Sequence, residues 1–194
     1  MTSFYPTISI PKVEIHLVGR WSDAANLPID IQEAINTGYQ QAVNHYTERF
    51  SKTIIKAIRT GNPPQGSGVY WPPLAESTQK KYHKGPDSHF YITGIYSRSI
   101  RIRRTKRYTT VGLARGQASA GSRDRRSGKS IAEVARILEF GTGDGGNTTI
   151  PARPLWRATL QALGGKPAIK AEVMKYIRRA LLAKGIRANQ VRFS

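Results

Sequence analysis

Apolar residues recur at three- and four-residue steps from Asp30 to Thr60, which predicts one long amphipathic helix. Its expected apolar face consists of Ile31, Ile35, Tyr39, Ala42, Val43, Tyr46, Phe50, Ile54, Ala57 and Ile58. Asp30 with Glu33 resembles a capping box, and Gly61 before two prolines predicts the end of the helix. At 1.5 Å per residue such a helix is roughly 45 Å long. We therefore expect it to span the whole subunit.

The remaining pattern predicts shorter elements. A period of two indicates a strand over residues 8–18 and a β-hairpin over 98–113, with its turn at 105–107. Further helices are predicted over residues 74–82, 94–99, 131–140, 154–163 and 167–185. Residues 137–140 also fit a short strand. Together these elements predict an α+β fold, a small antiparallel sheet with one long helix and packed C-terminal helices.

The length of 194 residues favours a single domain over residues 1–194. Within it, residues 115–130 are low in apolar side chains and rich in Gly, Ser and Arg, which predicts a mobile basic loop. Residues 186–194 are interpreted as a basic C-terminal tail.

The sign of the charge is the strongest bulk signal. The chain has 31 Lys and Arg against 12 Asp and Glu, a formal net charge of +19. Such a balance favours polyanions or acidic protein surfaces as partners. The absence of cysteine excludes disulfides, Cys-ligated zinc and thiol catalysis. No apolar run approaches the roughly 18 residues of a membrane span, and the N-terminus lacks the pattern of a signal peptide, so we expect no membrane partner.

The cations are densest between residues 98 and 129, where Asp124 is the single acid. Contact with nucleic-acid phosphates needs many Lys and Arg but no base-reading geometry. Since no zinc-finger or helix-turn-helix pattern accompanies them, we expect binding without sequence preference. A solvated surface is the alternative. The candidate DNA-facing residues are Arg98, Arg101, Arg103, Arg104, Lys106, Arg107, Arg123, Arg125, Arg126 and Lys129.

Enzyme chemistry finds no support in the sequence. The spacing Gly141-x-Gly143-x-x-Gly146 matches a dinucleotide fingerprint, but prolines intervene before the next helix and no β-α-β pattern surrounds it. His83 and His89 lack a carboxylate cluster that would complete a metal site. No nucleophile motif is present. We therefore expect no catalytic residue, no metal and no cofactor.

Residues 131–160 combine a glycine-rich break with a stiff segment. Pro151 and Pro154 fix their own φ near −65° and favour extended backbone at Ile150 and Arg153. Such a segment loses little entropy on docking, so it is interpreted as an inter-subunit clamp, with residues 141–147 as its adaptable loop. The candidate clamp residues are Glu139, Phe140, Gly141, Pro151, Arg153, Pro154, Leu155 and Trp156.

Within the clamp, Leu155 and Trp156 are expected to be exposed, and Arg153 to reach a carboxylate or a carbonyl, with Glu139 as one candidate. The alternative is wholly internal: the segment turns the chain into a helix, and Leu155 and Trp156 fill the subunit's own core.

Four short islands between Trp71 and Leu160 resemble a known family. They are Trp71-Pro-Pro-Leu with Thr78, Thr93-Gly-Ile-Tyr with Ser99-Ile100, Val111-Gly112, and Glu139-Phe-Gly-Thr with Ile150-Pro-Ala-Arg-Pro154. In their motifs and their order they resemble the tailed-phage tail-completion proteins. These are also called head–tail joining or neck proteins, and are related to the virion-morphogenesis proteins of transposable phages. Position 155 departs from the family, with Leu in place of Phe, and Trp156 supplies an aromatic.

The resemblance implies a virion structural protein, a ring-forming neck or tail-completion component that joins the DNA-filled head to the tail. It implies a homo-oligomer, with a hexamer preferred, assembled in the host cytoplasm. The implied neighbours are a head-completion, adaptor or portal-side ring, the tail terminator or tail tube, and genomic DNA in the lumen. The alternatives are the adjacent tail terminator itself and a non-virion protein that binds nucleic acid without sequence preference.

Overall fold

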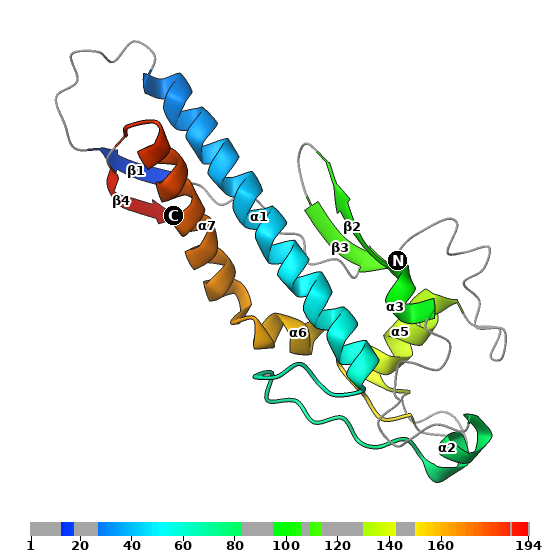
Figure 1. Cartoon of the computed structure of the whole chain (residues 1–194). Coiled ribbons are helices and arrows are strands. Elements are labelled where there is room, and N and C mark those ends of the chain that lie inside the picture. The colour runs from blue at the N-terminus through cyan, green and yellow to red at the C-terminus, as the bar shows by residue number, and fades with distance from the viewer. Residues whose placement is uncertain are drawn as a thin grey trace. The chain divides into compact units, whose positions relative to one another are not determined.

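The computed structural model describes residues 13–17, 27–82, 95–105, 109–113, 130–142, 150–186 and 188–193 (Figure 1). The predicted α+β fold class is confirmed: one long helix and shorter helices accompany small two-stranded sheets. In chain order the elements are β1 (Val13–Leu17), α1 (Leu27–Thr60), α2 (Glu76–Tyr82), α3 (Ile95–Ser99), β2 (Ile100–Arg104), β3 (Thr109–Leu113), α5 (Ile131–Phe140), α6 (Trp156–Ala162), α7 (Gly165–Ala183) and β4 (Ala188–Phe193).

The chain divides into two compact units. Unit 1 comprises Met1–Glu48, Arg104–Thr109 and Lys166–Ser194, and unit 2 comprises Arg49–Arg103 and Thr110–Gly165. Helix α1 contributes its first part to unit 1 and its last part to unit 2. A single cooperative domain over residues 1–194 stays a prediction.

The long helix is confirmed, but its start differs from the expectation. α1 begins at Leu27, because Pro28 lies in the first turn, where its missing N–H breaks no helical hydrogen bond. Asp30 is therefore inside the helix, and its predicted capping box with Glu33 is wrong. Both carboxylates instead contact the Lys184 ammonium, at 3.1 Å and 2.8 Å. The predicted end is right: Gly61 has φ 70° and donates its N–H to the Ala57 carbonyl at 3.0 Å.

The core of unit 1 is an antiparallel pair of helices, α1 and α7, which lie side by side in Figure 1. The direction follows from the cross-pairs, since Lys184 meets the start of α1 while Glu172 pairs with His45 further along it. The buried residues are Ala34, Tyr39, Ala42 and Val43 from α1 and Val173, Ile177 and Leu181 from α7.

A glycine permits the closest approach of these two helices. A Cβ added to Gly38 would lie 2.5 Å from the Ile177 Cα and 2.8 Å from the Tyr176 carbonyl oxygen. Both obstacles are backbone atoms, so no side chain can rotate away. Ala34 and Ala42 lie one turn before and after Gly38 on the same face, and both are buried. Three small residues at four-residue steps thus let α7 lie directly against α1.

The C-terminus differs from the expectation of a basic tail. Residues 188–193 form β4, which pairs antiparallel with β1, with Val13 opposite Phe193 and Leu17 opposite Ala188. The physical reason is backbone pairing: β1 presents unpaired N–H and C=O groups, and a second strand satisfies them. The prediction missed β4 because a six-residue strand carries too short an alternation. Of the strand expected over residues 8–18, residues 13–17 are described and extended.

The hairpin over 98–113 is confirmed as β2 paired with β3. Only four residues connect the strands, and such a short connection requires antiparallel pairing. The burial pattern of β2 alternates as predicted, with Ile100 buried and Arg101 and Arg103 exposed. Most of the expected turn and nearly all of the predicted basic loop lie outside the described residues.

Replacement of Gly38 by Ala tests the close helix pair. Although Ala is the better helix former by about 1 kcal/mol, the clash with backbone of α7 is expected to lower the free energy of unfolding by about 1–3 kcal/mol. Urea unfolding followed by circular dichroism measures this change. Gln41→Ala, at an exposed position of the same helix, is the control and should change stability by less than about 0.5 kcal/mol. A Gly38→Ala protein as stable as the control would contradict the packing.

Candidate functional site

Segments far apart in the sequence meet within unit 2, around the stretch interpreted above as a clamp. We call this cluster the Pro-Arg-Pro junction and define it by residues Trp71–Pro73, Tyr96, Glu139–Thr142 and Ile150–Trp156. Three of the four islands of the family resemblance contribute residues to it. Direct hydrogen bonds connect them across as many as 83 positions of sequence.

Glu139 is the buried acid of the junction, with 4% of its surface exposed at the end of α5. Its Oε2 accepts the N–H groups of Leu155 at 2.7 Å and Trp156 at 3.0 Å, and its Oε1 accepts that of Arg157 at 3.1 Å. These donors open α6, whose N-cap residue Leu155 has no side-chain hydrogen bond to offer. The carboxylate therefore caps α6 from another helix and places a negative charge at its N-terminus.

Arg153 is the buried base of the junction and is also 4% exposed. Its Nε donates to the Pro72 carbonyl at 3.0 Å, and its Nη2 donates to the Pro73 carbonyl at 3.1 Å. A third, longer bond of 3.4 Å joins Nη1 to the Pro151 carbonyl. Burial lowers the pKa of the guanidinium from its usual value, but arginine stays charged in proteins. The planar fork of Arg thus ties the segment to two successive proline carbonyls.

Aromatic side chains close the junction. The Trp71 indole, 4% exposed, donates its N–H to the Pro154 carbonyl at 3.2 Å. The half-buried Trp156 donates its own indole N–H to the Tyr96 hydroxyl at 3.2 Å. Burial raises the pKa of Tyr96 above its ordinary value, with the nearby Glu139 charge as a smaller cause. The Phe50 and Trp156 rings lie 6.1 Å apart, so α1 also contributes to this apolar contact.

Glycine is required where the chain leaves α5. Gly141 has φ 76°, and a Cβ there would lie 2.7 Å from the Ile150 carbonyl oxygen. The same carbonyl accepts the Thr142 N–H at 3.0 Å, and the Ile150 N–H donates to the Thr142 Oγ1 at 2.8 Å. Arg153 N–H also reaches the Leu138 carbonyl at 2.6 Å. The two sides of the glycine-rich loop are therefore joined by main-chain bonds, while residues 143–149 lie outside the described ones.

The structure corrects one detail of the clamp prediction. Leu155 is 1% exposed, so the expectation that it is exposed is wrong; it fills the core of unit 2. Arg153 does reach carbonyls, as expected, whereas Glu139 caps α6. These contacts favour the internal interpretation for Arg153 and Leu155. An inter-subunit role of the segment stays a prediction, and Phe140 and Ile150 are the large apolar side chains that it exposes, at 53% and 37%.

The sequence analysis missed Pro72, Pro73 and Tyr96 as members of this cluster. Prolines donate no hydrogen bond, so they give no polar signal, but an extended Pro-Pro pair presents its carbonyls outward. The order of the family islands was the available signal, because all three residues lie within them or beside them.

The predicted DNA-facing residues are only partly within the described chain. Arg98, Arg101 and Arg103 are exposed in unit 2, on α3 and β2. Arg101 donates to the Arg98 and Ile100 carbonyls. Lys106, Arg107, Arg123, Arg125, Arg126 and Lys129 lie outside the described residues. A DNA-facing role of this set stays a prediction.

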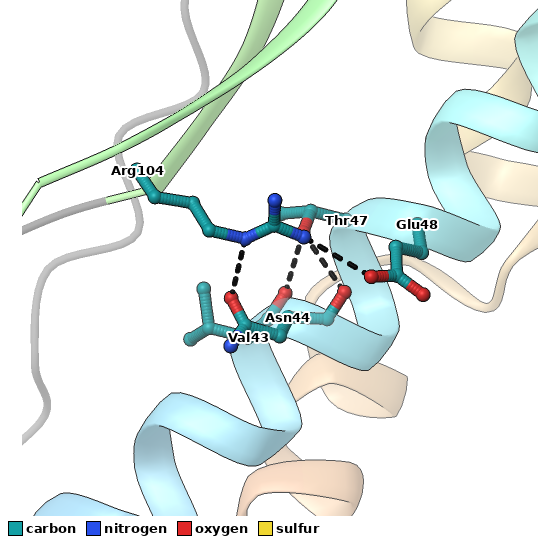
Figure 2. Close-up of polar contacts among 5 residues, drawn as sticks. All are labelled: Val43, Asn44, Thr47, Glu48 and Arg104. Carbon is teal, nitrogen blue, oxygen red and sulfur yellow. Dashed lines mark hydrogen bonds and ion pairs between the residues drawn. The ribbon is translucent and has the colours of Figure 1, made fainter.

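Arg104 has a protein partner on α1, within unit 1. Its Nε donates to the Asn44 Oδ1 at 2.9 Å and its Nη2 to the Glu48 Oε1 at 3.0 Å (Figure 2). Thr47 lies between these two residues in the sequence. Its hydroxyl donates a hydrogen bond to the Val43 carbonyl at 2.8 Å and not to Arg104. Both charged side chains are about half exposed, and such pairs contribute at most about 1 kcal/mol. Arg104 is therefore engaged by protein groups on α1.

Comparisons with known proteins assign no family to the chain. No protein-family model matches the chain, and neither a curated protein nor a solved structure matches it. Among the described residues, no group of three or more His, Cys, Asp or Glu could hold a metal ion. No helix in the described part of the chain is long and apolar enough to cross a membrane.

The buried cap can be tested by Glu139→Gln. The amide keeps the shape but presents an NH2 group to N–H donors, which leaves buried groups unpaired and should lower the free energy of unfolding by about 1–3 kcal/mol. Glu133→Gln, on the same helix, is the matched control. Glu133 belongs to the exposed capping box of α5 with Ser130, and Gln serves there almost as well. Thermal unfolding of the two variants compares them directly. Equal stability would contradict the role of Glu139.

Arg153→Ala and Trp156→Ala separate the internal from the inter-subunit interpretation. Arg153→Ala removes three hydrogen bonds donated by a charged group and should destabilise the dilute protein by about 2 kcal/mol or more. Trp156→Ala should cost about 3 kcal/mol. Arg157→Ala, at an exposed neighbouring position, is the control and should change little. Variants with full stability but failed assembly would support the clamp as an inter-subunit contact instead.

Proposed function

We propose that this chain is a virion structural protein of a tailed phage, a ring-forming neck or tail-completion component between the DNA-filled head and the tail. One observation supports this proposal above the others. Residues of the family-like islands are mutual partners: Trp71 with Pro154, Arg153 with Pro72 and Pro73, and Trp156 with Tyr96.

Mutual contact gives the resemblance a physical basis. Short motifs that match by chance have no reason to meet in space, whereas motifs that define a shared core must do so. The islands carry the buried polar contacts of unit 2, and such contacts are satisfied only when all partners are present. A fold that retains these residues retains the junction as a whole.

The formal net charge of +19 fits a protein that surrounds packaged DNA. It fits equally a non-virion protein that binds nucleic acid without sequence preference, which is the alternative from a different class. Ring formation separates the two, because only the neck protein needs a closed assembly. The adjacent tail terminator is a further alternative that shares the ring, and cross-linking within virions distinguishes it by its neighbours. In none of these roles is the chain an enzyme.

The exposed edge of the Pro-Arg-Pro junction is the surface that we assign to assembly. Phe140 and Ile150 are large, apolar and exposed. The Ile150 carbonyl accepts the Thr142 N–H and lies close to Gly141, so the Ile150 backbone is held next to the residues that follow Phe140. The buried bonds below make this edge rigid, so little conformational entropy is lost when a neighbour covers it. Rigid apolar edges of this kind are suited to subunit contact.

Native mass spectrometry and electron microscopy of the purified chain test the proposal. We expect a closed homo-oligomer, a hexamer by preference. Phe140→Ser should shift the population toward folded monomer, because it removes an apolar contact without touching the buried bonds. Tyr70→Ser is the matched control, since Tyr70 is another exposed aromatic of unit 2, at 76%. A chain that stays monomeric at every concentration would count against the ring. A Phe140→Ser protein that assembles normally would count against the assigned edge.

A further inference from the structure

The last third of α1 carries a line of cations that the sequence analysis did not single out. Arg49, Lys52, Lys56 and Arg59 are all exposed and belong to unit 2. They are spaced by three, four and three residues, so at 3.6 residues per turn they share one face within about 80°. The line is about 15 Å long, which matches the rise of roughly four nucleotides of one DNA strand. We call it the α1 stripe.

Charge is segregated along α1. From Leu27 to Glu48 the helix contains three acids and neither Lys nor Arg, whereas from Arg49 to Thr60 it contains four cations and no acid. The three acids are all paired with cations from elsewhere in unit 1, Asp30 and Glu33 with Lys184, and Glu48 with Arg104. The first part of the helix thus shows balanced charges.

Three cations of the stripe, Lys52, Lys56 and Arg59, have no such balance among the described residues. The acids of unit 2 in the described ranges are Glu76, Glu133 and Glu139, and each is engaged elsewhere. Glu76 pairs with Lys80, and the other two cap helices. No ion pair or hydrogen bond joins the side chain of Lys52, Lys56 or Arg59 to any residue in the described part of the chain.

This arrangement opposes the stability of the helix itself. Like charges three and four residues apart repel, while alternating signs would attract. Only Arg59, in the last turn, gains from the negative end of the helix dipole. A solvated helix face has no need to accept this repulsion, but a face that neutralises a polyanion does.

We propose that the α1 stripe is a nucleic-acid phosphate-binding surface that contacts duplex DNA without sequence preference. Lys offers a point charge rather than a base-reading fork, so contacts to phosphates are expected and contacts to base edges are not. The stripe contains none of the predicted DNA-facing residues on the hairpin. It does not depend on ring formation, so it applies equally to a monomer.

Two other partners fit the stripe less well. An amphipathic helix that lies on an anionic membrane inserts an exposed apolar face, but the apolar face of this part of α1 is buried: Ile54, Ala57 and Ile58 are at most 3% exposed. An acidic protein surface would be matched by scattered cations as well as by a straight line of them. The cations of α7, including Lys170, Lys175 and Arg178, are scattered around that helix.

The test compares two triple variants with the unchanged chain. Lys52→Gln, Lys56→Gln and Arg59→Gln are combined in the stripe variant, and Lys175→Gln, Arg178→Gln and Arg179→Gln in the control. Both lose three exposed helical cations, and Gln is a good helix former. Binding to two unrelated 25-base-pair duplexes is measured by fluorescence anisotropy at several salt concentrations.

The stripe variant should bind both duplexes more weakly, by the same factor, and the slope of log affinity against log salt should fall in magnitude by about three. The control should keep most of the affinity. Circular dichroism must show the stripe variant to be folded, with a Tm no lower than that of the control. Native mass spectrometry measures the oligomeric state separately, so that a failure of ring formation is distinguished from a failure of DNA binding by the stripe.

Several results would overturn the inference. One is a stripe variant that keeps the affinity and slope of the unchanged chain. Another is an equal or larger loss in the control, which would assign binding to α7 or to overall charge. Stripe-dependent binding to phosphatidylserine vesicles or to polyglutamate that is tighter than binding to DNA would assign the surface to a membrane or to an acidic protein.

Discussion

The junction in unit 2 depends on two buried charges that are satisfied by main chain. Glu139 accepts three N–H groups at the start of α6, and Arg153 donates to carbonyls of two prolines. A buried charge without partners is among the most costly defects in a protein. Each charge therefore fixes the path of a segment distant in sequence. The spatial arrangement of α5, the glycine-rich turn and α6 depends on these contacts.

The sequence predicted the helices well because their periodicity is long and strong. The face of α1 was correct from Ile31 to Ile58, and the helix predicted over residues 167–185 is present as α7. It missed β4, because the pairing of β4 with β1 is a long-range contact that the six residues of β4 do not reveal by themselves. The burial of Leu155 was missed for a related reason. The two prolines predict a stiff backbone, but they do not predict which side chains of the segment face the core.

Sequence could identify the members of the site better than their partners. Arg153 and Glu139 were candidates because of their motif, yet the acceptors of Arg153 are carbonyls, which every residue has. Side-chain chemistry therefore cannot reveal them. The α1 stripe was overlooked for the opposite reason. Its residues lie on the polar side of the predicted helix, and the separation of these cations from the acids of the first part of α1 is what makes the line distinctive.

Both tryptophans in the described part of the chain belong to unit 2, so their fluorescence reports on that unit. Trp71 and Trp156 both lie in the Pro-Arg-Pro junction, whereas the described aromatic residues of the α1–α7 pair are Tyr39, Tyr46, Tyr176 and His45. Trp21, the third tryptophan, lies outside the described residues. In a Trp21→Phe background, indole emission would report the melting of unit 2, while far-ultraviolet dichroism would report both units. Coincidence of the two curves would mean one cooperative domain, and separate curves would mean two.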